Sequence, residues 1–142
     1  MVADLIIGPA LFLGLIIGAY EIIVMHKDVT VPTHRFLHML HALVLSVLFV
    51  FASINVDFVL SIIPALNDIP LLGNALILRI AIGFVAMIKI HLVSKVIPGT
   101  SNLNIKGVSE TWFHSFVVGG LIVAAPYVYP FVKEAIPSWM NF

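Results

Sequence analysis

Three histidines with helical spacing lie in the stretch from His34 to His41 of a largely apolar chain. His34, His38 and His41 are separated by four and three residues. At about 100° per residue, their side chains fall within about 60° of one another around a helix. Imidazole nitrogens bind copper, zinc, iron and haem iron, and they relay protons near neutral pH. The spacing therefore predicts that the three side chains can share a ligand, an ion or a neighbouring helix.

The composition indicates an integral membrane protein. Of the 142 residues, 61% are hydrophobic and 10% are charged, and the mean hydropathy is +1.16, far above the balance of a soluble domain. Seven basic and seven acidic residues cancel, so no basic surface favours nucleic acid. Cysteine is absent, which excludes disulfides and thiolate chemistry, so any metal must use histidine, carboxylate or other oxygen ligands.

Four apolar segments have the length of membrane-spanning helices. We expect them at about 5–25, 34–54, 71–93 and 110–132, since a span needs about 20 apolar residues. Residues 55–70 are open to three interpretations: a loop, a re-entrant piece, or an extension of the second helix to residue 63. Pro126 and Pro130 predict a kink or an end in the fourth helix. The chain is expected to be one transmembrane domain over 1–142, an all-α antiparallel bundle of four transmembrane helices with short loops.

The first expected helix carries small residues at every fourth position. Ala10, Gly14 and Gly18 have the spacing that lets two membrane helices approach closely. Glu21 follows Gly14 by seven residues and lies on nearly the same side of the helix. We expect Glu21 to face protein, since ionisable residues inside membrane segments usually do so; the alternative is that it reaches the headgroups.

Arg79 lies early in the third expected helix, where a charge needs an explanation. Its long side chain can reach outward to water. The more specific alternative is that Arg79 forms an ion pair with Asp57 or Asp68.

The distribution of basic residues predicts the orientation in the membrane. The side of the histidine stripe is flanked by Lys27, Arg35, Lys89, Lys95 and Lys106, against Arg79 and Lys133 on the other side. By the positive-inside rule, the histidine side faces the cytoplasm. Four spans then place both termini on the extracytoplasmic side.

Threading four antiparallel helices brings all six histidines to one side of the membrane. The first helix ends near His26, the third ends near His91, and the fourth begins near His114. We expect two members of the stripe, two histidines from facing helices and two carboxylates to be the candidate metal ligands: His38, His41, His91, His114, Glu21 and Glu110.

Three interpretations of this cluster are open. In the first, the residues mark the cytoplasmic interface, and hydrogen bonds among them hold the helix ends together. In the second, they bind a transition metal (copper, zinc or iron) or haem b inside the bundle. In the third, they form a proton or ion path with Glu21 as a binding site. A bound cofactor and no cofactor are equally open.

The pattern of histidines at one depth in a helical bundle resembles membrane-anchor subunits of respiratory oxidoreductases and bundles of the cytochrome b type. The resemblance is one of pattern, so no functional residue is carried over. We expect a small polytopic subunit of a larger membrane complex, such as an oxidoreductase, that is not catalytic alone and contacts lipid and other membrane subunits. The alternatives are a homo-oligomeric transporter or proton-coupled channel that uses Glu21 and the histidine stripe, and a structural membrane anchor.

Overall fold

Four long helices dominate the structure. The computed structural model describes residues 2–28, 32–93 and 111–140. The helices are α1 (Gly8–Asp28), α2 (Pro32–Ile54), α3 (Val56–Ile62), α4 (Ala75–Val93) and α5 (Trp112–Val132), with short 3₁₀ helices η1 (Pro64–Asp68), η2 (Lys133–Ala135) and η3 (Ser138–Met140). No strand occurs in these ranges. The all-helical class predicted from the sequence is confirmed for the described residues.

The long helices have the length and apolar character of membrane spans. α1, α4 and α5 are each long and apolar enough to cross a bilayer. The fourth candidate is α2 together with α3, which pass the same test as a pair and are bent by 51° at the break between them. Helices of 19 to 23 residues are roughly 30 Å long, which matches the hydrocarbon core of a bilayer. These features are those of a multi-pass membrane protein.

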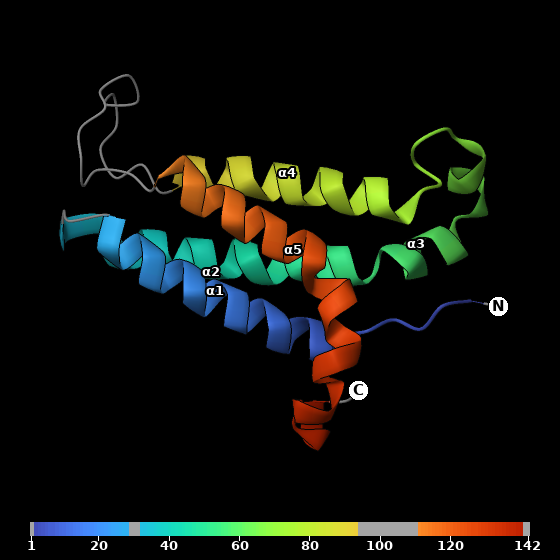
Figure 1. Ribbon diagram of the computed structural model, residues 1–142, viewed down its shortest axis with the longest axis horizontal. Helices are drawn as coiled ribbons and strands as arrows, with labels where there is room; N and C mark the ends of the chain where they lie inside the picture. Colours follow the sequence, from blue (N-terminus) through green and yellow to red (C-terminus); the bar gives the residue numbers. More distant parts are fainter. Residues whose placement is uncertain (1, 29–31, 94–110, 141–142) are drawn as a thin grey trace.

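Successive long helices run in opposite directions (Figure 1). α1 packs along α2 and α4 packs along α5, while α2 also contacts both α4 and α5. As a result, the end of α1, the start of α2, the end of α4 and the start of α5 lie at one end of the structure (Figure 1). We call this the histidine end. The start of α1 and the end of α5 lie at the opposite end, together with the break between α2 and α3.

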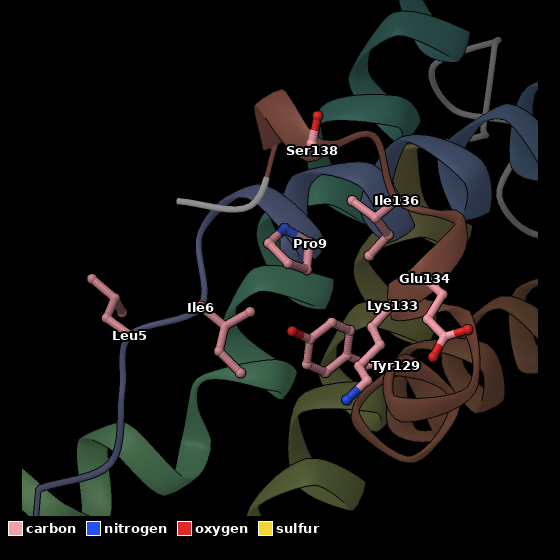
Figure 2. Close-up of a pocket in the computed structure, with 8 residues that line it drawn as sticks. All are labelled: Leu5, Ile6, Pro9, Tyr129, Lys133, Glu134, Ile136 and Ser138. Carbon is pink, nitrogen blue, oxygen red and sulfur yellow. The ribbon is translucent and has the colours of Figure 1, made fainter.

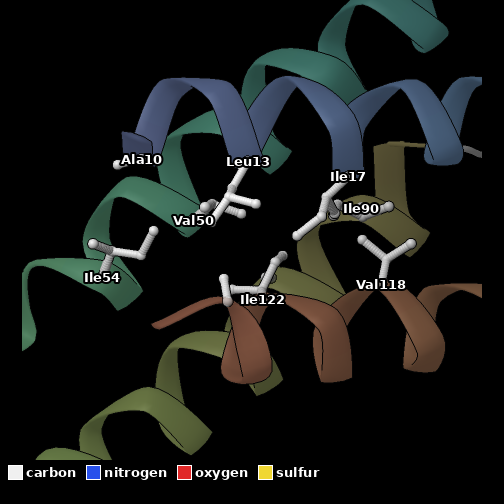
Figure 3. Close-up of a cluster of buried hydrophobic side chains, with 10 residues drawn as sticks. Ala10, Leu13, Ile17, Val50, Ile54, Ile90, Val118 and Ile122 are labelled. Atoms are coloured by element: carbon white, nitrogen blue, oxygen red, sulfur yellow. The ribbon is translucent and has the colours of Figure 1, made fainter. Parts of the chain in front are cut away.

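The core is an apolar layer to which all four long helices contribute. Figure 3 shows its side chains meeting between the helices. They are Ala10, Leu13 and Ile17 from α1, Val50 and Ile54 from α2, Ala86 and Ile90 from α4, and Val118, Ile122 and Ala125 from α5. The outer faces are apolar as well, with exposed residues such as Leu15, Phe84 and Phe116. Helices that are apolar on all sides suit a lipid environment.

Glycines allow close approach within each helix pair. A Cβ atom on Gly14 would lie 2.8 Å from the Cα atom of Val47, and one on Gly18 would collide with Leu43. Ala10, on the same stripe, is fully buried. The α4–α5 pair has its own contact, since a Cβ atom on Gly83 would lie 2.7 Å from the carbonyl oxygen of Gly119. Only glycine leaves room for these backbones, as in close-packed membrane helices generally.

The first helix begins three residues later than the sequence predicts. The amide of Ile6 donates to Oδ1 of Asn55 at 2.7 Å, and Nδ2 of Asn55 donates to the Ile6 carbonyl at 2.8 Å. These bonds hold the segment before Gly8 outside a helix. Pro9, at the second position of α1, is typical of a helix start, where its missing N–H is not needed.

The structure shows helical residues within 55–70 and a helix that continues past the prolines. Residues 56–62 form α3, a bent continuation of α2, and the 3₁₀ helix η1 follows. Pro126 and Pro130 do not end α5, which continues to Val132. The last turns of α5 change direction (Figure 1), which corresponds to the predicted kink.

Candidate functional sites at the two helix ends

Glu21 and four of the histidines lie at or near the histidine end with different degrees of exposure. Glu21 is fully buried within α1 and His91 is buried in the last turns of α4. His38 and His114 are half-buried, whereas His41 is exposed. The expectation that Glu21 faces protein is therefore confirmed. The burial of the histidines shows that they do not share one environment.

His91 connects α4 to the start of α5. Its ring stacks on the Trp112 ring, with the centroids 3.7 Å apart and the planes at 17°. Its Nδ1 atom lies 3.3 Å from Oγ of Ser115, which is fully buried. Stacking and a hydrogen bond together fix the ring at the α4–α5 junction. Trp112 is itself more than half exposed, as expected for an aromatic residue at a membrane interface.

A second contact connects the end of α1 to the start of α5. The Asp28 carboxylate accepts a hydrogen bond from the Thr111 amide at 2.9 Å and lies 2.7 Å from Nδ1 of His114. Oγ1 of Thr111 is also 2.9 Å from that nitrogen. Thr111 is the residue immediately before α5, and a carboxylate is favourable at a helix N-terminus because the free N–H groups there carry partial positive charge.

The sequence did not single out Asp28 or Thr111. Asp28 follows His26 and Lys27 and reads as part of a polar connection, although its position at the end of the first span is a signal that it could meet the start of the fourth. The predicted ligand Glu110 lies outside the described residues, as does the side chain of His34. Their part in the cluster stays a prediction.

The described residues do not include three or more His, Asp or Glu side chains placed so that they could hold a metal ion. His91 and His114 are instead engaged with Ser115 and Asp28. The metal or haem site formed by His38, His41, His91, His114, Glu21 and Glu110 therefore remains a prediction, without geometric support from the part of the chain that is described.

The opposite end is organised around one cation. The Arg79 side chain is only 8% exposed, and its Nη2 atom lies 2.6 Å from Oδ2 of Asp57, whose side chain is 59% exposed. Of the alternatives for Arg79, the structure shows the ion pair, and its partner is Asp57. Such charge-assisted contacts are stronger than neutral hydrogen bonds.

Two further partners of Arg79 were not predicted. Nε donates to the carbonyl oxygen of Ser53 at 3.3 Å, and Nη1 donates to the Tyr127 hydroxyl at 3.2 Å. The guanidinium carbon also lies 5.2 Å from the centre of the Tyr127 ring, within the range of cation–π attraction. Ser53 lies in the last turn of α2, where carbonyl groups lack partners inside the helix. The break between α2 and α3 thus provides an acceptor for Arg79.

The fold and these contacts define a broad class, helical proteins with three to four helices able to cross a membrane. Comparisons with known protein families, with curated proteins and with solved structures find no match to the chain.

Proposed function

We propose that the protein is a four-span integral membrane protein that acts as a small subunit of a larger membrane complex. In this proposal α1, α4 and α5 each cross the bilayer once, and α2 with α3 forms one bent span in an antiparallel bundle. The histidine end faces the cytoplasm and both termini lie outside. The lengths and apolar character of the helices support the spans, and the excess of basic residues on the histidine side supports the orientation.

The observation that carries the subunit role is the poor coverage of α4 and α5. In the most apolar stretch of each of these helices 28% of the residues are buried, against 56% in α1. Phe84 of α4 and Phe116 of α5 are both more than half exposed. Since α4 and α5 also pack on each other, a neighbouring subunit can cover exposed apolar side chains of both helices. We assign the partner contact to these side chains.

The polar contacts at the histidine end fit a structural role within such a subunit. Asp28 with His114 joins α1 to α5, and His91 with Ser115 joins α4 to α5. Hydrogen bonds of this kind hold membrane helices together. They favour the interpretation of the histidines as junction residues over that of cofactor ligands.

Photo-crosslinking in native membranes tests the subunit role. A photoreactive phenylalanine analogue is placed at Phe84 or Phe116, with Leu15 on α1 as the matched exposed control. We expect crosslinks to a different protein from the first two positions and far fewer from Leu15. Crosslinks only to copies of the same chain, or equal yields from all three positions, would contradict the proposal and favour a homo-oligomer or a monomer surrounded by lipid.

The absence of cysteine allows a direct test of the orientation. Single-cysteine variants Lys27→Cys and Lys133→Cys are treated with a membrane-impermeant maleimide in intact cells and in inverted vesicles. We expect Cys at 27 to react only in inverted vesicles and Cys at 133 only in intact cells, because the two positions lie at opposite ends of the helices. Labelling of both from one side would refute the four-span arrangement.

The cofactor hypothesis needs its own measurement. An absorption spectrum and elemental analysis of the detergent-purified protein are compared with those of His38→Ala and His41→Ala. A Soret band or a stoichiometric metal that is lost in these variants would make the protein a cofactor-bearing subunit. A colourless protein free of metal would contradict the cofactor hypothesis and favour the histidines as residues that join the helix ends.

The burial of Glu21 supports a second candidate function, proton-coupled transport. An ionisable side chain buried inside a membrane helix is a candidate functional site by default, and Glu21 is fully buried. Proteoliposomes that contain the wild type, Glu21→Gln or Glu21→Asp are compared for proton flux. Flux that is lost in the glutamine variant and retained in the aspartate variant would establish this function, whereas equal flux in all three would exclude a role for Glu21.

A further inference from the structure

A cavity of about 690 Å³ opens at the end of the structure opposite the histidines. One wall is the segment before and at the start of α1, and the other is the end of α5 with the 3₁₀ helices that follow it (Figure 2). Leu5, Ile6, Pro9 and Ile136 give the cavity an apolar part. A volume of this size is typical of sites for small organic molecules.

Both walls are fixed by contacts outside the cavity. On one side, the backbone of Ile6 is held through its amide and its carbonyl by Asn55. On the other side, η3 returns to the start of α1, where a Cβ atom on Gly8 would overlap the Met140 carbonyl oxygen. Ile136 and Met140 are buried. The backbone of both walls is therefore held by the rest of the structure, while the side chains of Lys133 and Glu134 are exposed to the surroundings.

The polar groups of the cavity combine both signs of charge. Lys133 and Glu134 line it next to each other, and Tyr129 and Ser138 add two hydroxyl groups. Tyr129, Lys133 and Glu134 all come from the end of α5 and from η2 (Figure 2). The Lys133 ammonium and the hydroxyls can donate to phosphate oxygens, whereas the Glu134 carboxylate can accept hydrogen bonds from an ammonium group. The net charge of the lining is zero, so it complements a ligand that carries one charge of each sign.

The position of the cavity favours a membrane lipid as the ligand. It lies where α1 begins and α5 ends, which is the level of the lipid headgroups if these helices span the membrane as proposed above. Trp139, three residues after Ile136, is largely exposed, as is common for aromatic residues at that level. The apolar part of the cavity suits the first methylene groups of an acyl chain.

We propose that this cavity binds a zwitterionic phospholipid of the phosphatidylethanolamine type. Its phosphate lies against Lys133 and Tyr129, and its ammonium group lies against Glu134. The inference rests on the membrane placement in the proposed function and adds a ligand class to it. An anionic lipid such as phosphatidylglycerol offers no positive group to Glu134, and the site discriminates against it.

Native mass spectrometry of the detergent-purified full chain tests the assignment. Phosphatidylethanolamine or phosphatidylglycerol with the same acyl chains is added, and the lipid-bound fraction is measured. We expect the wild type to retain phosphatidylethanolamine about tenfold more tightly, the ratio that one charge-assisted hydrogen bond provides. Glu134→Gln should abolish this preference, and Lys133→Gln should weaken the binding of both lipids. Equal retention of the two lipids by the wild type would overturn the proposal.

Matched variants and a soluble competitor complete the experiment. Lys89→Gln and Asp68→Asn remove one exposed charge each away from the cavity and should leave the lipid preference unchanged; a change equal to that of the cavity variants would also overturn the assignment. Soluble phosphoethanolamine, which lacks the acyl chains, should displace the lipid only weakly. Full displacement by phosphoethanolamine at the same concentration as the lipid would mean that the site binds a free phosphate ester. A wrong membrane placement would show in the maleimide labelling, whereas a wrong ligand would show in the mass spectrometry. The failure of the proposed function and the failure of the lipid assignment can therefore be told apart.

Discussion

The two ends of the bundle are held together in different ways. At one end, Arg79 of α4 contacts Asp57 of α3, the Ser53 carbonyl of α2 and Tyr127 of α5. At the histidine end, two contacts among the described residues each join a pair of helices: Asp28 with His114, and His91 with Ser115. At the first end, one side chain therefore reaches three other elements, and Asn55 in addition holds the segment before α1. The other end distributes its polar contacts over several shorter side chains.

The chemistry of the two ends follows from this difference. A guanidinium group is always charged, so a buried arginine must keep its partners or suffer the cost of desolvation. An imidazole can be neutral, and burying it costs much less. We therefore expect the arginine end to be sensitive to single substitutions and the histidine end to tolerate them.

Arg79→Met should have the largest effect. It removes an ion pair and two further hydrogen bonds, and we expect a loss of about 2–3 kcal/mol in the free energy of unfolding, because hydrogen bonds to charged groups contribute more than neutral ones. The remaining Asp57 is largely exposed and can be hydrated, which limits the cost. Unfolding by a denaturing detergent in mixed micelles, followed by circular dichroism, measures the change.

Two variants sharpen this first prediction. Arg79→Lys keeps the charge but cannot form the same set of directed hydrogen bonds, so its stability should fall between those of the wild type and Arg79→Met. Asp57→Asn should cost less than Arg79→Met, since Arg79 keeps its other two partners. Wild-type stability in Arg79→Met would show that the arginine does not connect these helices.

Asn55→Leu should have the next largest effect. Asn55 makes two hydrogen bonds to the backbone of Ile6 and one to the Phe51 carbonyl, and their loss should cost about 2 kcal/mol, because partly buried backbone groups lose their partners. Hydrogen exchange at residues 3–7 should accelerate while exchange in α4 stays unchanged. The comparison variant is Ser61→Ala, which removes the bond from the Ala3 amide and the bond that the hydroxyl donates to the Phe58 carbonyl. It should have a smaller effect, because both bonds to Ile6 remain. Equal exchange in both variants would contradict this role of Asn55.

Asp28→Asn tests the first contact of the histidine end. The amide still accepts a hydrogen bond from the Thr111 amide but loses its negative charge beside His114 and the start of α5, so we expect a loss of about 1 kcal/mol. Asp28→Leu, which removes both contacts, should cost more. The stability is measured as for Arg79→Met, and a loss as large as that of Arg79→Met would abolish the proposed difference between the two ends.

His91→Phe should have the smallest effect. An aromatic ring preserves the stack on Trp112 and loses the hydrogen bond to Ser115, so we expect a change of about 1 kcal/mol. His91→Ala should be worse, because it removes the ring as well. Trp112 fluorescence, measured in a Trp139→Phe background because the chain has two tryptophans, reports on the stack: it should change in the alanine variant and stay close to that of the parent in the phenylalanine variant.

The sequence predicts the helices well because length and hydropathy are local properties. The helix expected at 71–93 is observed as Ala75–Val93. The ion pair of Arg79 with Asp57 was also among the alternatives, since a charge in an apolar helix requires a partner. The expected starts of the first and third helices, about 5 and 71, differ by three and four residues from those observed, Gly8 and Ala75. Before α1, the contact between Asn55 and Ile6 joins residues far apart in the chain, and no local pattern reveals it.

The arrangement of the polar side chains was much harder to predict. The depth of His38, His91 and His114 follows from counting residues along each helix. Whether they converge depends on the rotation of each helix about its axis, and helices that are apolar on all sides carry little of that information in their hydrophobic pattern. For the same reason, the sequence could not identify Tyr127 as a partner of Arg79 or Asp28 as a partner of His114.

The contact between Gly8 and the Met140 carbonyl has a consequence for how the protein is made. The two residues lie at opposite ends of the described chain, and closing so long a loop is slow compared with forming a helix hairpin. During synthesis, α1 is made before residues 138–140. Its first turn therefore lacks the contact with Met140 while the other helices are inserted into the membrane. We expect this contact to be the last step of assembly, and a truncation before residue 138 to give a protein whose helices are inserted but whose first turn stays accessible to protease.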